Sequence, residues 1–159
     1  MSERIKTAVL RDFSVSLCRA AGLSADDAAL LTDSILFAEC RGVTSHGLLR
    51  LPQYIARLRS GATASNVPMP FTMESGGTAR LDAQNGLGQL AGRKASAKAE
   101  ELAAAYGVSF VAVANSNHFG TGAWYAIPSA QRGFFAFNLS DAPNAMTPYH
   151  AREALLGTD

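Results

Sequence analysis

The fold is decided by residues 78–114, TARLDAQNGLGQLAGRKASAKAEELAAAYGVSFVAVA. A strand-like run opens this stretch, an alanine-rich helical pattern fills residues 89–106, and a nearly all-apolar run with β-branched residues closes it at 108–114. An apolar run of that length is typical of a strand buried on both faces. Strand, helix and strand in this order favour parallel pairing, so we predict an α/β fold of mixed α+β character.

The neighbouring segments extend this pattern on both sides. Residues 71–75 and 78–81 flank Gly76-Gly77 and predict a hairpin. Residues 124–132 form a second, shorter helical pattern, and the apolar run at 134–139 predicts a further strand. The sheet is therefore expected to carry flanking helices.

Helical patterns fill the first third of the chain. They cover residues 5–21, the stretch between Ser24 and Gly42, and the stretch between Leu49 and Gly61. In the first of them Val9, Phe13 and Leu17 make an apolar stripe that is expected to face the core. A proline-containing linker follows, which divides the chain into a helical N-terminal unit, residues 1–61, and the first part of a mixed-sheet domain, residues 62–159.

Composition narrows the function classes. The 159 residues are 48% hydrophobic and 17% charged with a formal net charge of +1, and no Lys/Arg cluster favours a nucleic-acid partner. No apolar run reaches the roughly 20 residues of a membrane span, and the N-terminus lacks the apolar segment of a signal peptide. Two cysteines without a CxxC spacing suit a reducing compartment, so we expect a cytoplasmic protein that does not bind membranes.

The stretch Thr44-Ser45-His46-Gly47-Leu48-Leu49-Arg50 carries a hydroxyl, an imidazole and a guanidinium where two helical patterns meet. If the turn from Gly47 onward is helical, His46 and Arg50 project from the same side. Such a pair suits a small acid, because Arg grips a carboxylate through two parallel hydrogen bonds while His moves a proton near neutral pH. The alternative is a plain helix start with Thr44 or Ser45 as its cap.

A second histidine lies in the polar stretch Asn115-Ser116-Asn117-His118-Phe119-Gly120-Thr121-Gly122. This stretch directly follows the buried strand, and ligands gather beyond the carboxyl ends of strands in α/β sheets. Its glycines suit a loop whose backbone approaches a ligand. The alternative is a polar turn in which His118 caps the next helix.

Two other kinds of site are less favoured. Residues 86–91, GLGQLA, fit the loose dinucleotide fingerprint, but the next strand ends at Ala114-Asn115 without the acidic residue that a Rossmann unit needs. A metal site built from His46, His118, His150 and Cys40 lacks any close ligand spacing, so we expect no metal.

Four motifs in order resemble those of the malate/L-lactate dehydrogenase family. They are TSHGLLRLPQY at 44–54, NGLGQ at 85–89, SNHFG at 116–120 and LLGT at 155–158. The resemblance covers essentially the whole chain. It implies a non-Rossmann fold, homodimers, NAD or NADP as cofactor, and hydride transfer to or from a small 2-oxo or 2-hydroxy acid.

Carried over by position, the resemblance implies specific roles. Ser45 and His46 belong to a proton relay, Arg50 binds the substrate carboxylate, and His118 is a second candidate proton acceptor. The implied cofactor-binding residues are Asn117, Gly120, Ser140 and Ala142.

The sequence also departs from the family pattern. Ser140-Asp141-Ala142 stands where the family commonly has Thr-Asn-Ser, so a methyl group replaces a serine hydroxyl that the resemblance implies would face the cofactor. The resemblance further implies that the chain matches only the N-terminal half of a member. The alternative function is therefore a truncated, non-catalytic remnant that folds, dimerises or binds ligand weakly.

Overall fold

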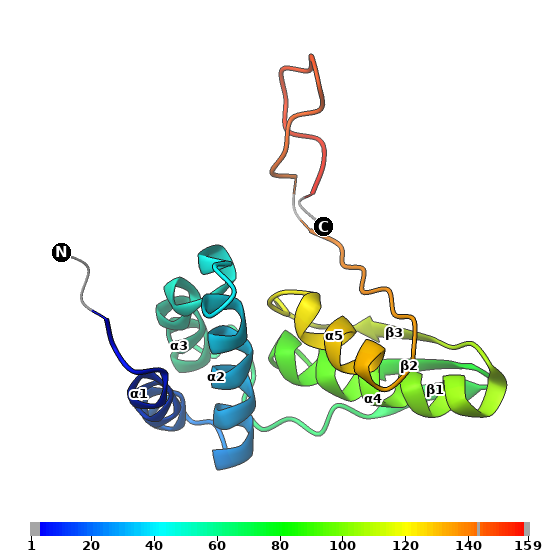
Figure 1. The fold of residues 1–159 in the computed structure, drawn as a ribbon, viewed down its shortest axis with the longest axis horizontal. Helices are drawn as coiled ribbons and strands as arrows, with labels where there is room; N and C mark the ends of the chain where they lie inside the picture. Colours follow the sequence, from blue (N-terminus) through cyan, green and yellow to red (C-terminus); the bar gives the residue numbers. More distant parts are fainter. Residues whose placement is uncertain (1–3, 143, 158–159) are drawn as a thin grey trace.

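The computed structural model describes residues 4–142 and 144–157. Figure 1 shows helices gathered at one end and a sheet with its own helices at the other. In chain order the elements are α1 (Thr7–Ala20), α2 (Ala25–Glu39), the 3₁₀ turns η1 (Thr44–His46) and η2 (Leu48–Arg50), α3 (Leu51–Arg59), β1 (Phe71–Ser75), β2 (Thr78–Asp82), α4 (Gly88–Tyr106), β3 (Phe110–Ala114) and α5 (Ala123–Gln131). The mixed α/β class is confirmed.

Helix α2 is the centre of the helical unit. It begins after Ser24, whose Oγ accepts the backbone N–H of Asp27 at 3.1 Å. Leu31, Ile35 and Ala38 form its predicted inner face and are fully or nearly fully buried. This face forms the first hydrophobic core together with residues of α1 and α3.

Of the predicted apolar stripe of α1, only Leu17 packs against the first hydrophobic core. Val9 and Phe13 are 57% and 59% exposed, whereas Ser14 and Cys18 are fully buried. The helix has apolar side chains on more than one side, and α2 covers the side that carries small residues because these let the two helices approach closely.

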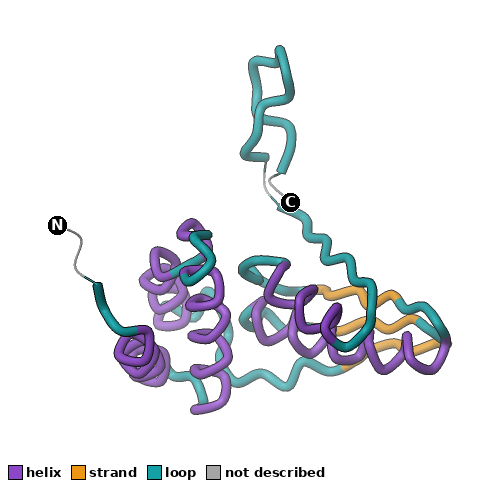
Figure 2. Tube along the Cα trace, in the orientation of Figure 1, coloured by secondary structure: helices purple, strands orange, loops and turns teal. Residues whose placement is uncertain are grey.

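The three-stranded sheet has the order β1-β2-β3. β1 and β2 form the predicted antiparallel hairpin, and β2 pairs with β3 in parallel. Ala79 and Leu81 of β2 point to the face that α4 covers, where they are buried. Figure 2 shows the strands lying beside α4.

The predicted strand at residues 134–139 does not form. The segment is extended but pairs with no described strand, and Figure 2 draws it as loop leading away from α5. Phe135, Phe137 and Leu139 are 86%, 78% and 83% exposed, while the alternate residues are partly buried. This alternation is typical of a strand, but no partner strand is present among the described residues.

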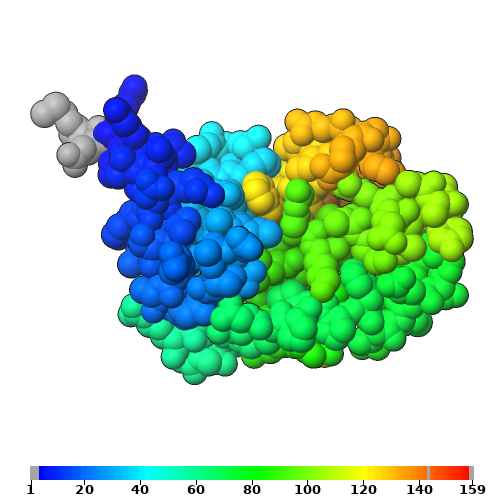
Figure 3. Space-filling model, turned by 90° about the horizontal axis from the view of Figure 1, so that it is seen from below, coloured from blue at the N-terminus to red at the C-terminus, as the bar shows by residue number. Residues whose placement is uncertain are grey.

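The helical unit packs directly on the sheet unit, as the continuous contact in Figure 3 shows. Leu87, just before α4, is buried in the core of the helical unit, and Leu90 contacts both hydrophobic cores. This packing places the turns that follow α2 beside the loop that follows β3. None of the described helices has the length and apolar character needed to cross a membrane.

Candidate functional site

The two predicted histidines lie together. The ring of His46, at the end of η1, and the ring of His118, in the loop after β3, stack with their centroids 5.3 Å apart and their planes at 26°. The site therefore joins two segments that are far apart in the sequence, one from each unit.

The backbone between His46 and Arg50 differs from the expected continuous helix. Gly47 has φ −88° and ψ −145°, so it separates η1 from η2. The Glu39 carboxylate accepts the N–H of Leu48 at 2.8 Å, and a Cβ at position 47 would collide with that carboxylate. Glu39 therefore shapes the motif, although it is not among the predicted site residues.

Neither Thr44 nor Ser45 caps a helix by its side chain. Instead the Oγ of Ser45 lies 3.0 Å from Nδ1 of His46. Arg50 folds back, and its Nε donates to the carbonyl of Ser45 at 2.7 Å. Its Nη1 donates to Gln53 Oε1 at 3.0 Å. The structure thus brings Ser45, His46 and Arg50 together. The continuous helical turn from which we predicted this arrangement is not present.

Two buried side chains that the prediction missed lie behind His118. The hydroxyl of Tyr54 is 2.6 Å from Nδ1 of His118, and Nε2 of Gln89 donates to the same hydroxyl at 2.6 Å. Tyr54 lies on α3 between the buried Leu51 and Leu58, so its helical spacing could have indicated burial. No local pattern indicates that it meets His118.

Electrostatics favour the neutral form of both histidines. Desolvation lowers the pKa of His46, and the Arg50 charge lowers it further. Desolvation also lowers the pKa of His118, with added effects of His46 and Arg50. Burial raises the pKa of Tyr54 to about 12, so this hydroxyl keeps its proton at neutral pH.

The predicted cofactor residues come from two segments of the chain. Nδ2 of Asn117 donates to the carbonyl and Oδ1 of Asn85 and to the carbonyl of Gly86, while its Oδ1 accepts from Arg57 at 2.8 Å. Gly120 is buried, and Ser140 and Ala142 lie on the extended segment after α5. Asn117 and Gly120 thus lie in the loop between β3 and α5, whereas Ser140 and Ala142 follow α5 in the chain.

The glycine-rich turn before α4 has a packing role. A Cβ on Gly88 would collide with the carbonyl oxygen of Asn117 and would lie 2.6 Å from that of His118. The loop backbone thus covers the first turn of α4, where a Rossmann unit would bind its pyrophosphate. Instead, this turn packs against the backbone of Asn117 and His118 in the loop after β3.

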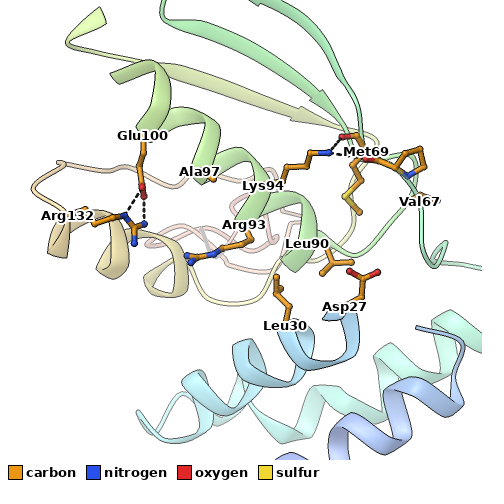
Figure 4. A pocket seen from close by; sticks show the side chains of 11 residues that line it. Asp27, Leu30, Val67, Met69, Leu90, Arg93, Lys94, Ala97, Glu100 and Arg132 are labelled. Atoms are coloured by element: carbon orange, nitrogen blue, oxygen red, sulfur yellow. Dashed lines mark hydrogen bonds and ion pairs between the residues drawn. The ribbon is translucent and has the colours of Figure 1, made fainter. Parts of the chain in front are cut away.

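A cavity of about 520 Å³ lies elsewhere, between α2, α4 and residues 67–69. Figure 4 shows that Lys94 reaches the carbonyl of Met69 and that Arg132 pairs with Glu100. Neither candidate histidine lines this cavity, and two of its cations are already engaged within the protein. Among the described residues no three His, Cys, Asp or Glu side chains gather closely enough to hold a metal ion.

Comparison with known proteins gives a consistent result. The family model described as malate/L-lactate dehydrogenase matches residues 5–159. The malate dehydrogenase of Pyrococcus abyssi is 33% identical over 98% of this chain and 43% of its own length. The L-sulfolactate dehydrogenase of Methanocaldococcus jannaschii is 35% identical over 87% of this chain and 40% of its own.

The fold agrees with these sequence matches. The structure of malate dehydrogenase from Pyrococcus horikoshii superposes with a TM-score of 0.89 and 28% identity, covering 98% of this chain and 45% of that one. The chain thus spans less than half the length of the relatives it matches. Over that span the family model and the fold agree, and the chain belongs to the malate/L-lactate dehydrogenase family.

Proposed function

We propose that this chain carries the acid-binding and proton-transferring part of an NAD(P)-dependent 2-hydroxyacid dehydrogenase site. The observation that supports this most strongly is the stacked pair His46 and His118 beside Arg50. Two imidazoles with lowered pKa and one guanidinium are suited to a small acid that gains or loses a hydroxyl proton.

The residues have separable tasks in this proposal. Arg50 holds the substrate carboxylate with Nη1 and Nη2, because its Nε is already bonded to Ser45 and only one Nη1 hydrogen bond goes to Gln53. A histidine near the substrate C2 oxygen exchanges the hydroxyl proton. The nicotinamide, when bound, supplies or accepts the hydride.

Turnover is expected to need more of the family fold than these 159 residues. The Asn117 side chain is already bonded to Asn85, Gly86 and Arg57, and the relatives are more than twice as long as the matched span. For the chain alone the second candidate function is a remnant that binds a small acid without turnover. That function is favoured by the same two observations.

The test compares the 159-residue chain with a completed chain, in which these residues are fused to the remaining part of the Pyrococcus horikoshii malate dehydrogenase. Each is mixed with NADH or NADPH and a panel of 2-oxo acids while absorbance is followed. We expect turnover by the completed chain with at least one acid. A completed chain that folds but is inert with every acid would contradict the proposal.

The remnant is tested separately by titrating the 159-residue chain with malate and following the histidine resonances by NMR. Shifts of His46 and His118 that saturate without turnover would identify an acid-binding remnant.

We also propose, on the family resemblance, a homodimer in the cytoplasm. Sedimentation of the completed chain at twice the monomer mass would support the dimer, and a monomer would contradict it.

A further inference from the structure

Behind the histidine pair lies a buried polar chain that the proposed chemistry does not use. Gln89, on the first turn of α4, is 1% exposed, and Tyr54 on α3 is 5% exposed. The Gln89 amide, the Tyr54 hydroxyl and the His118 imidazole are joined by two hydrogen bonds of 2.6 Å. Buried polar groups joined in this way restrict one another, because each bond needs one donor and one acceptor.

The direction of these bonds follows from the donors available. The amide Nε2 of Gln89 can only donate, so the Tyr54 oxygen accepts from it. The hydroxyl has one proton, and the remaining partner is Nδ1 of His118. The Tyr54 pKa of about 12 keeps that proton in place. Nδ1 of His118 therefore accepts, and the neutral imidazole carries its proton on Nε2.

The amide orientation of Gln89 supports this direction. As it stands, the atom left buried without a partner is Oε1, a single acceptor. Turning the amide round would leave an NH₂ group with two donors in that place. A buried unpaired N–H is rarer in proteins than an under-satisfied carbonyl, so the observed orientation is the less costly one.

His46 is held differently. Its Nδ1 lies 3.0 Å from the Oγ of Ser45, which is exposed and whose hydroxyl hydrogen can rotate. Ser45 can therefore donate to Nδ1 or accept from it, and neither tautomer of His46 is penalised. Nε2 of His46 makes no hydrogen bond within the described part of the chain.

We propose that Tyr54 and Gln89 are positioning residues that fix His118 with its proton on Nε2, so that His118 donates a hydrogen bond to the substrate oxygen while His46 carries the exchanged proton. This division of roles rests on the proposed function. In the proton step the substrate O–H bond breaks, a bond forms between that proton and Nε2 of His46, and Ser45 accepts from the Nδ1–H of the resulting imidazolium.

The first experiment reads the tautomer directly, without turnover. The 159-residue chain is labelled with ¹⁵N in its imidazoles, and long-range ¹H–¹⁵N correlation is recorded at a pH where the histidines are neutral. His46→Gln and His118→Gln variants assign the signals. We expect His118 to show an unprotonated Nδ1 and a protonated Nε2, while His150 on the exposed tail averages between tautomers in the same spectrum. A proton on Nδ1 of His118, or averaging like that of His150, would overturn the proposal.

The second experiment tests the two positioning residues. Tyr54→Phe removes the donor, so His118 should lose its tautomer bias and average. Tyr125→Phe is the matched control, because Tyr125 is also buried but its hydroxyl donates to the carbonyl of Phe119. If Tyr54→Phe does not fold, Gln89→Leu provides the same test, since the Tyr54 oxygen is then free to accept from Nδ1. An unchanged tautomer in the folded variant would overturn the roles of Tyr54 and Gln89.

The third experiment tests the division of labour in the completed chain. His46→Gln should lower kcat by about 100-fold or more, the usual range for losing a general acid or base. His118→Gln should cost about 10-fold less than that, because the glutamine amide still offers an N–H donor. The reverse order would overturn the division of roles. An inert wild-type completed chain would contradict the proposed function instead, while the tautomer measured in the first experiment would still stand.

Discussion

Arg50 makes structural contacts and, in the proposed function, also binds the substrate carboxylate. Its Nε donates to the carbonyl of Ser45, and this bond fixes the guanidinium beside the η1 turn that carries His46. Its charge is close enough to lower the pKa of His46 and that of His118. A lysine at this position would keep the charge but lose the planar fork.

We therefore predict that Arg50→Lys in the completed chain raises KM for the 2-oxo acid by about 10-fold to 100-fold, the range expected for a lost charge-assisted hydrogen bond. Steady-state kinetics with the best acid of the panel measure this change. Arg59→Lys is the control, because Arg59 is exposed at the end of α3 and its side chain makes no hydrogen bond within the described residues. An unchanged KM for Arg50→Lys would contradict its role as the carboxylate ligand.

At the scale of elements, the first turn of α4 and the loop after β3 depend on each other. The loop carbonyls of Asn117 and His118 lie where a Cβ of Gly88 would stand. Asn117 ties the same loop to the turn before α4 through hydrogen bonds to Asn85 and Gly86. The position of the His118 ring therefore depends on how closely these two backbones approach.

Gly88→Ala is expected to destabilise the chain by about 1–3 kcal/mol, the usual cost of overpacking, because backbone atoms and not a flexible side-chain end must move. Urea unfolding measures the cost, and the His118 resonances should shift in the folded variant. Gly122→Ala is the control, since its Cβ would meet only Asn138 at an ordinary 3.6 Å. Equal effects of the two substitutions would show that the close approach at Gly88 does not matter.

The extended segment at residues 134–139 is a second case at this scale. It presents Phe135, Phe137 and Leu139 on one side, and no described strand pairs with it. An apolar strand with unpaired backbone groups is prone to associate with other chains.

The Phe135→Ser, Phe137→Ser double variant of the 159-residue chain should self-associate less than the wild type. Its free energy of unfolding should change by less than about 0.5 kcal/mol per site, because both side chains are exposed. Sedimentation velocity over a range of concentrations measures the association. Tyr149→Ser, which removes an aromatic that is 92% exposed on the same tail, should not reduce it. Equal association of the double variant and the wild type would contradict this prediction.

At the scale of the whole molecule, the lowered histidine pKa values link folding to pH. An unfolded histidine binds its proton near pH 6.5, whereas His46 and His118 in the folded chain bind theirs at lower pH. Below pH 6.5 the unfolded state therefore holds more protons, and stability falls as the pH falls. The pKa values of Asp82 and Glu100 are also lowered, by hydrogen bonds from Asn115 and Arg132, but those carboxyls lose their contribution only at more acidic pH.

We predict that the free energy of unfolding decreases between pH 6.5 and pH 5, and that the His46→Gln, His118→Gln double variant removes most of this decrease. Urea unfolding at several pH values measures it. His150→Gln, a change on the exposed tail, should leave the profile as it is in the wild type. A wild-type profile that is flat over this interval would contradict the prediction.

Much of the local structure was predictable because it depends on nearby residues. The cap at Ser24, the hairpin at Gly76-Gly77 and the buried face of α2 follow from spacing and residue type alone. The two histidine motifs were also identified from residue types and their place after predicted elements. Spacing did not reveal which side of α1 would be covered, because the helix offers apolar side chains on more than one side and α2 packs on the small ones.

Residue type and spacing were enough to predict the helices, the hairpin and the parallel strand pair, and to single out His46, His118 and Arg50 as candidate site residues. The folded structure adds that His46 and His118 stack, and that Gln89 bonds to Tyr54, which bonds to His118. It also shows that residues 134–139 pair with no strand among the described residues. The physical reason is the distance along the chain over which each kind of interaction acts. Periodicity and capping act within a few residues, whereas these contacts depend on the packing of the helical unit against the sheet unit and on which strands are present to pair.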